Sequence, residues 1–258
     1  MSRPDSEAVL LDVENGVARI VLNRPDTGNA LTVEICHGLR AAFESVSNDP
    51  SARVVLFSAQ GRQFCAGGDL RAIASAPDHA AFVLELVTAA HAAVRSIAAL
   101  PKPVVTVVHG AAAGAGLSLV LLSDLVVASD RASFMTAYTA VGLTPDCGQS
   151  WLLPRAIGTT RGLDLTLQPR RVGAAEALSI GLIARVAADG THLAQADQLA
   201  RSLADGPAAA SGQARALIRQ GYAAGFDAQL DLEAATIAAM AGTAESAALI
   251  AAFLEASE

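Results

Sequence analysis

A stretch of twenty residues without formal charge, Val104 to Ser123, limits what this chain can fold into more than any other feature. It is long enough to cross a bilayer as one helix. It begins, however, with the β-branched run VVTVV after Pro101 and Pro103, and it continues into a cluster of glycine and alanine. β-branched residues favour strands and clustered glycines favour turns. The stretch therefore predicts a buried strand, a glycine turn and a packed helix, and we expect no membrane span.

Strand-like and helix-like segments alternate along the first three quarters of the chain, which predicts an α/β core. The expected strands are residues 17–22, 53–58, 103–108 and 125–128, and the expected helices are residues 31–47, 80–100 and 117–122. From about Thr191 the pattern becomes helical and rich in alanine, with breaks at Gly206-Pro207 and Gly225. We therefore predict an α/β core over residues 1–190 and a helical region over residues 191–258.

Composition excludes several classes of function. Hydrophobic residues make up 52% of the 258 residues and aromatic residues only 4%, so the core must be aliphatic. The net charge is −7 and Arg170-Arg171 is the only adjacent basic pair, which disfavours a nucleic-acid partner. Cys36, Cys65 and Cys147 form no CxxC pair, and no histidine has metal-ligand spacing, so we expect free buried thiols and no metal. The N-terminal residues lack the apolar segment of a signal peptide, which predicts a cytoplasmic protein.

Two glycine-rich turns, about 48 residues apart, each follow a predicted buried strand. The first is FCAGGDL, from Phe64 to Leu70, and the second is GAAAGAG, from Gly110 to Gly116. Glycines allow a sharp bend that presents free N–H groups. The second turn also opens a predicted helix, whose N-terminus favours an anion or a developing oxyanion.

The second turn has an alternative interpretation, because a strand followed by GxxxGxG and a helix resembles the phosphate loop of short-chain dehydrogenases. Three observations disfavour it. The turn lies at residue 110 instead of after the first strand, and neither Tyr138 nor Tyr222 is followed by lysine four residues later. The acid expected about twenty residues on, at the end of a second strand, is absent unless Asp130 takes that role.

Taken together, the two turns and their neighbouring segments resemble the crotonase (enoyl-CoA hydratase/isomerase) superfamily over essentially the whole chain. The supporting runs are LNRPDTGNAL, GRQFCAGGDL, KPVVTVVHGAAAGAGLSL, SDLVVASDRASF and the closing AAFLE. The resemblance implies an α/β fold with a crotonase-like ββα spiral core and a helical C-terminal oligomerisation region. It also implies a homotrimer or a dimer of trimers, with an acyl-CoA thioester as substrate and no cofactor besides the coenzyme A of that substrate.

The resemblance further implies how the thioester is held. The backbone N–H groups of Ala66 and Ala115 would form the oxyanion hole, and Arg24 would lie near the adenosine end of coenzyme A. The implied substrate-binding residues are Arg24, Ala66, Gly67, Gly68, Asp69, Leu70, Ala115 and Tyr138. From its position before the helix expected at Leu70, Asp69 is also predicted to cap that helix.

The chain departs from similar hydratases at both positions where they carry glutamate, which here are Ser118 and Tyr138. Neither is a carboxylate base at neutral pH, so water addition by the two-glutamate route is disfavoured. An acid does follow, at Asp146 in GLTPDCGQSWLLPRAIG. On residue pattern alone, Pro-Asp-x-Gly is also ordinary turn chemistry.

Within the resemblance, Asp146 matches the base of dienoyl-CoA isomerases and, most closely, of ring-1,2-epoxyphenylacetyl-CoA isomerases. Its apolar neighbours would partly exclude water, as a general base near neutral pH requires. We therefore predict an acyl-CoA isomerase that shifts a proton and double bond, or opens a ring epoxide, with Asp146 as the catalytic residue.

Three alternatives stay open at this point. One is another crotonase reaction, such as hydration with water positioned by Asp146 or Ser118. A second is a non-catalytic acyl-CoA-binding member. A third, as in aroyl-CoA dehalogenases, would use Asp146 as a nucleophile with His79 or His91 nearby.

Overall fold

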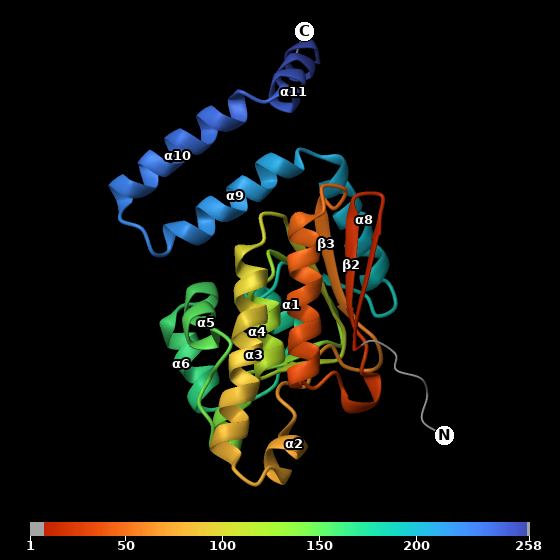
Figure 1. The fold of residues 1–258 in the computed structure, drawn as a ribbon, viewed down its shortest axis with the longest axis vertical. Helices are drawn as coiled ribbons and strands as arrows, with labels where there is room; N and C mark the ends of the chain where they lie inside the picture. Colours follow the sequence, from red (N-terminus) through yellow and green to blue (C-terminus); the bar gives the residue numbers. More distant parts are fainter. Residues whose placement is uncertain (1–7, 257–258) are drawn as a thin grey trace.

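The structure, a computed structural model, describes residues 8–256 and consists of an α/β body with a helical extension at its C-terminal end (Figure 1). The strands are β1 (Val9–Glu14), β2 (Val17–Leu22), β3 (Val54–Ala59), β4 (Val104–Val108), β5 (Ala111–Ala113), β6 (Leu125–Ser129), β7 (Ser133–Met135), β8 (Val172–Gly173) and β9 (Arg185–Ala187). The helices are α1 (Val33–Asn48), α2 (Leu70–Ser75), α3 (His79–Ala99), α4 (Ala115–Leu121), α5 (Gln149–Ile157), α6 (Thr159–Leu167), α7 (Ala174–Ser179), α8 (His192–Asp205), α9 (Ala208–Gly221), α10 (Phe226–Ala241) and α11 (Ala244–Glu255), with 3₁₀ turns η1 (Pro25–Thr27) and η2 (Tyr138–Val141).

Two sheets organise the body. The larger has six strands in the order β1-β2-β3-β4-β6-β9, in which only the β1–β2 pair is antiparallel. The smaller has the order β5-β7-β8. Parallel strands need crossover connections, and the helices supply them on the way from β2 to β3 and from β3 to β4. The α/β prediction is confirmed, whereas the second sheet was not predicted.

Strand β4 lies in the middle of the larger sheet and is buried on both faces. Val104 and Val108 join the core formed with α1 and α3, whereas Val105 and Val107 join a second core under α8. A strand covered on both sides cannot tolerate charge, which explains why its sequence resembles a membrane segment. The predicted strand, turn and helix over residues 104–123 are confirmed as β4, a turn containing β5, and α4.

By length and composition, one helix of the described residues, α3, could cross a membrane, and α10 with α11 would pass as a bent pair. Helix α3 lies beside α1 in the body, as Figure 1 shows, and it buries Leu86, Ala93 and Ile97 in the core. Part of its apolar surface therefore packs in the core, with 28% of the apolar window buried.

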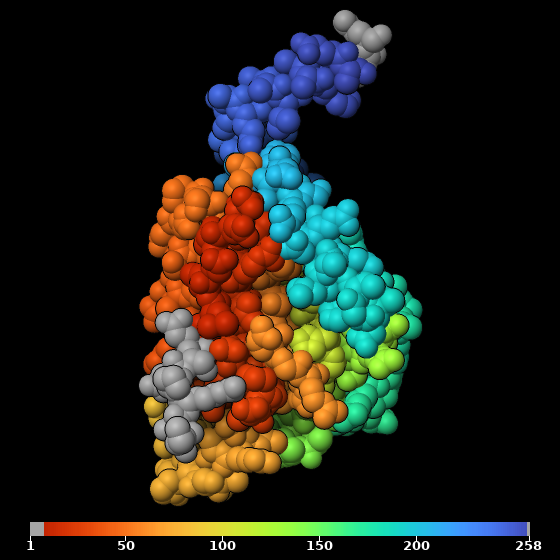
Figure 2. Space-filling model, turned by 90° about the vertical axis from the view of Figure 1, so that its right-hand side faces the viewer, coloured from red at the N-terminus to blue at the C-terminus, as the bar shows by residue number. Residues whose placement is uncertain are grey.

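The C-terminal helices differ in how they pack. Alanines of α8, Ala196, Ala200 and Ala204, lie in the second core against the sheet. Helices α10 and α11 extend away from the body and contain no buried residue (Figures 1 and 2). Helix α8 packs as part of the body, and the extension begins after it. The predicted division into two regions at residue 190 stays a prediction.

Candidate active site

The two glycine-rich turns lie side by side because their main chains are hydrogen-bonded to each other. Cys65 N–H donates to Ala111 O at 3.1 Å, and Ala113 N–H donates to Cys65 O at 3.0 Å. Gly116 packs so closely that a Cβ there would lie 2.3 Å from Cys65 O. Only glycine fits at such a distance from a carbonyl oxygen, so the sequence of the second turn is required for it to reach the first.

Two glycines with positive φ shape the space between the turns. Gly67 has φ 99°, and a Cβ on it would lie 2.9 Å from Ala113 O, while Gly114 has φ 52° and ψ −123°. Ala115 follows as the first residue of α4, and within residues 8–256 its N–H has no hydrogen-bond acceptor. An unpaired N–H at a helix N-terminus is suited to bind an oxyanion.

The amide of Ala66 differs from the prediction, because it is already occupied. Ala66 N–H donates to the carbonyl oxygen of Gly28 at 3.0 Å, so it is not free to bind a thioester. The Gly68 N–H, in contrast, has no partner among the described residues. Of the expected donors, Ala115 therefore has an unpaired N–H and Ala66 does not, and the unpaired N–H in the first turn is that of Gly68.

A cavity of about 120 Å³ lies where the two turns meet. Gly68 and Ala115 line it together with Asp146 and Tyr138, and α3 contributes an apolar wall that includes Leu86 and Val87. Free main-chain donors, one carboxylate and an apolar wall thus converge on the same space. This combination is the usual composition of a small-molecule site.

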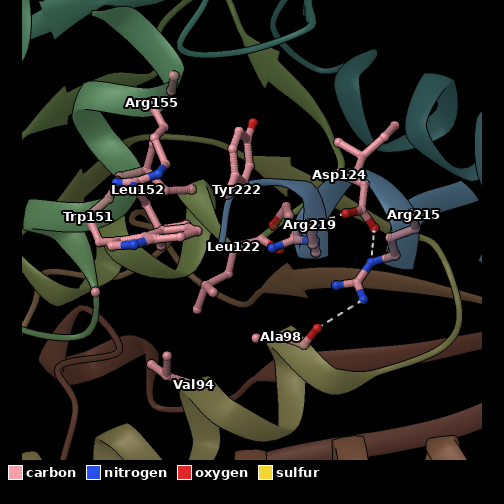
Figure 3. A pocket seen from close by; sticks show the side chains of 15 residues that line it. Val94, Ala98, Leu122, Asp124, Trp151, Leu152, Arg155, Arg215, Arg219 and Tyr222 are labelled. Carbon is pink, nitrogen blue, oxygen red and sulfur yellow. Dashed lines mark hydrogen bonds and ion pairs between the residues drawn. The ribbon is translucent and has the colours of Figure 1, made fainter. Parts of the chain in front are cut away.

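A larger cavity of about 570 Å³ lies between α3, α4, α5 and α9 (Figure 3). Its one carboxylate, Asp124, is paired with Arg215 at 2.7 Å and with Arg219 at 2.8 Å. On its other side the Arg155 guanidinium lies over the Trp151 ring, 3.8 Å from the centroid. Because Asp124 is already paired with two arginines, this cavity has no free carboxylate among the described residues, so we place the candidate active site in the smaller cavity.

Asp146 is held by contacts on both its carboxylate and its backbone. The Tyr138 hydroxyl donates to Asp146 Oδ1. The Asp146 carbonyl oxygen accepts from Gln149 N–H at 2.9 Å and from Ser118 Oγ at 3.4 Å. Burial, reinforced by the nearby Asp146 carboxylate, raises the pKa of Tyr138 above its ordinary value. Tyr138 is therefore a protonated donor to Asp146, and not a base.

His91, on α3, fixes the loop that carries Asp146. Its Nε2 lies 3.1 Å from the backbone nitrogen of Cys147, which has a positive φ of 50°. Since a backbone N–H can only donate, His91 Nε2 must be the acceptor and the ring must be neutral in this arrangement. The ring nitrogen that could accept a proton is therefore already engaged with the backbone of Cys147.

The other predicted binding residues lie in different places relative to the cavity. The Asp69 carboxylate accepts from Arg71 N–H and Ala72 N–H, both at 3.1 Å, so the predicted helix cap is confirmed. Leu70 lines the cavity and is half-exposed. Arg24 is not part of the cavity wall, and its guanidinium donates to Thr32 Oγ1 at 3.4 Å. The role predicted for Arg24 near adenosine stays a prediction.

All three cysteines are free and buried, as predicted. Burial raises the pKa of Cys36 to about 12. It raises the pKa of Cys65 to about 12 as well, although a backbone hydrogen bond from Gly67 acts in the opposite direction. Burial also raises the pKa of Cys147. Thiols held in the protonated form are poor nucleophiles, and Asp146 is the carboxylate that lines the cavity. Within residues 8–256 no group of three His, Cys, Asp or Glu side chains could hold a metal ion.

Comparison with known proteins identifies the family of the chain. The family model "Enoyl-CoA hydratase/isomerase" matches residues 12–258. The chain is 39% identical to the 1,2-epoxyphenylacetyl-CoA isomerase of Escherichia coli (strain K12), over 88% of this chain and 87% of that protein. It is 28% identical to 4-chlorobenzoyl coenzyme A dehalogenase-2 of Arthrobacter sp., over 94% of this chain and 88% of that protein. The crystal structure of an enoyl-CoA hydratase from Polaromonas sp. JS666 matches 96% of both chains at 32% identity, with a TM-score of 0.90. The chain belongs to the enoyl-CoA hydratase/isomerase family, has the α/β crotonase fold with C-terminal helices, and is an acyl-CoA enzyme of that superfamily.

Proposed function

We propose that this protein is an acyl-CoA isomerase in which Asp146 moves a proton between carbons of an unsaturated or ring-epoxide acyl-CoA. The observation that carries the proposal is the set of groups around one cavity. Asp146 is its carboxylate, and the Gly68 and Ala115 amides are free donors. By the resemblance to hydratases, Tyr138, which lines the cavity, and Ser118, which does not, stand where hydratases carry glutamate. The similarity to 1,2-epoxyphenylacetyl-CoA isomerase supports the same conclusion.

The proposed proton shift needs only groups that the chain supplies. The Asp146 carboxylate takes a proton from a carbon conjugated with the thioester, and the electron pair left behind forms an enolate. The negative charge collects on the thioester oxygen, and the Gly68 and Ala115 N–H groups stabilise it by donating hydrogen bonds to that oxygen. Protonated Asp146 then returns the proton to a different carbon, so that the double bond has moved and the enzyme is regenerated.

The two parts of this machinery contribute comparable amounts. One oxyanion donor is typically worth about 2.7–4 kcal/mol in the transition state. A positioned acid–base group is typically worth about 10²–10⁴ in rate. The Tyr138 hydroxyl supports the base by holding Asp146 Oδ1 at the cavity while remaining protonated itself.

Substitution of Asp146 by Asn tests the proposal, because it keeps the shape of the side chain and removes the base. Proton exchange and double-bond shift of enoyl-CoA thioesters would be followed in heavy water by mass spectrometry and chromatography. We expect Asp146→Asn to lower turnover by about two to four orders of magnitude, with CoA-thioester affinity retained. Ser118→Ala is the matched control at a hydratase glutamate position and should lose far less.

Three outcomes would contradict the proposal. Near-wild-type turnover of Asp146→Asn would mean that another group is the base. A product with added water would support hydration instead. Tight binding of acyl-CoA without exchange in the wild-type protein would support the non-catalytic member of the family.

We also propose a homo-oligomer, a trimer or a dimer of trimers, in the cytoplasm. The support is the exposed apolar surface of α10 and α11, where Phe226, Ile237 and Phe253 are each more than two-thirds exposed. Monomeric soluble proteins rarely expose large contiguous apolar surface. Sedimentation velocity of the full chain checks this proposal, and a monomer at micromolar concentration would contradict it.

A further inference from the structure

We propose that Gln149 is a positioning residue that fixes the Ala115 amide relative to the Asp146 base. The inference rests on the proposed function, because it assigns a role within the same site. It goes further by naming a residue that neither touches the substrate nor titrates. Gln149 is the first residue of α5 and is almost completely buried, with 1% of its surface exposed.

Gln149 contacts both halves of the proposed machinery. Its side-chain Nε2 donates to the carbonyl oxygen of Gly114 at 2.9 Å. Its backbone N–H donates to the carbonyl oxygen of Asp146, also at 2.9 Å. A single residue thus joins the turn that supplies an oxyanion donor to the loop that supplies the base.

The contact with Gly114 acts on Ala115 because both belong to one peptide unit. In a trans peptide the C=O and the following N–H point in opposite directions, so a donor that holds Gly114 O also aims Ala115 N–H away from Gln149. The other side of Gly114 is held by its own N–H, which donates to Met135 O at 3.0 Å. Hydrogen bonding to a carbonyl also polarises the peptide and strengthens its N–H as a donor.

Ser118 provides a second link between the same two segments. Its buried Oγ lies 3.4 Å from Gln149 Nε2 and 3.4 Å from the Asp146 carbonyl oxygen. The side chain at this hydratase glutamate position therefore belongs to the network around Gln149. Together the contacts form a closed path from the Ala115 peptide through Gln149 and Ser118 to the backbone of Asp146.

The side-chain oxygen of Gln149 helps to separate a positioning role in catalysis from a contribution to folding stability. Its Oε1 is buried and has no hydrogen-bond partner within residues 8–256. An unpaired buried oxygen opposes folding, and such groups in folded proteins call for a separate explanation. The Gly114 carbonyl, in contrast, would keep acceptor contacts with Leu117 N–H and Ser118 N–H if the side chain were removed. An apolar side chain of the same size should therefore be tolerated by the fold.

Gln149→Met is the variant that tests the inference, since it keeps the length of the side chain and removes both polar atoms. Gln213→Met, at an exposed position of α9, is the matched control. The carbonyl stretch of bound butyryl-CoA labelled with ¹³C at the carbonyl would be measured by difference infrared spectroscopy. The same proteins would be compared in proton exchange of enoyl-CoA, giving kcat and KM separately, and in melting temperature.

We expect Gln149→Met to lower kcat about tenfold with KM nearly unchanged, to reduce the downward shift of the carbonyl band, and to keep or raise the melting temperature. Gln149→Leu should behave in the same way, and Gln213→Met should match the wild type. A wild-type carbonyl shift that persists unchanged in Gln149→Met would overturn the inference and leave the proposed function intact. A lower melting temperature with normal kcat would also overturn it. A wild-type protein without any carbonyl shift would refute the oxyanion hole itself, and the role of Gln149 with it.

Discussion

Replacing Ala115 by proline should remove one oxyanion donor while leaving the fold in place. Ala115 is the first residue of α4, where a missing N–H costs no helix hydrogen bond and where proline is favoured. The preceding Gly114 has ψ −123°, outside the α region that a following proline disfavours. One donor is worth about 2.7–4 kcal/mol, so turnover should fall by about 10²–10³. The melting temperature should stay close to that of the wild type.

The assay is proton exchange of an enoyl-CoA in heavy water, with Ala115→Ser as the control that keeps the N–H. The proline ring would occupy the space that the N–H faces, so affinity is measured with an S-alkyl-CoA thioether that has no carbonyl oxygen. Retained thioether affinity with lost turnover identifies the missing donor as the cause. The reasoning is refuted if folded Ala115→Pro keeps more than a tenth of wild-type turnover, or if Ala115→Ser loses as much.

Four further predictions concern packing, charge, the thiols and the C-terminal extension. Gly116→Ala places a Cβ 2.3 Å from Cys65 O and should destabilise the protein by about 1–3 kcal/mol or more in urea unfolding; unchanged stability would show that the turns can separate. Asp124→Ala leaves the Arg215 guanidinium, whose side chain is 5% exposed, without its carboxylate and should cost about 3 kcal/mol by the same measurement, against a change near zero for exposed Glu85→Ala. Burial raises the pKa of the Cys36 thiol from 9.0 to about 12. The free energy of unfolding is therefore unaffected by ionisation of this thiol below pH 9 and falls as the pH rises from 9 toward 12, by up to about 1.4 kcal/mol per pH unit. Cys36→Ala should reduce this slope when urea unfolding is measured as a function of pH. Deleting residues 227–258 should yield monomers or aggregates in light scattering, and a soluble, active trimer would contradict the role of the extension.

The long periodic elements could be predicted from the sequence, whereas the second sheet could not. Strand β2 begins and ends where expected, and α3 differs by one residue at each end, because many alternating or helically spaced side chains mark such elements. Strands β5, β7 and β8 have only two or three residues, too few for any period to appear. Strands β5 and β7 pair beside the second glycine-rich turn, where Ser133 N–H donates to Gly110 O and Gly114 N–H donates to Met135 O, and β8 pairs with β7.

The candidate site divides in the same way. The sequence predicted that Asp146 and Ala115 act together, and the structure places both on one cavity. The sequence could not show that the Ala66 N–H is already hydrogen-bonded. Its acceptor, Gly28 O, belongs to a residue 38 positions earlier in the chain and comes close only in the folded structure. For the same reason nothing local marked Gln149, whose partners are supplied by two other segments.

The neighbouring glycines of the first turn should behave very differently in a saturation mutagenesis screen. Gly67 has a positive φ, and a Cβ there would lie 2.9 Å from Ala113 O, so nearly every substitution should be rejected. A Cβ at Gly68 would meet only Leu86 Cδ2, at 3.8 Å, and most side chains keep the backbone N–H. A screen scored by activity would therefore report that Gly68, the proposed donor, tolerates substitution and that its neighbour Gly67 does not. Groups that act through the main chain are hidden from side-chain mutagenesis, and only proline would reveal them.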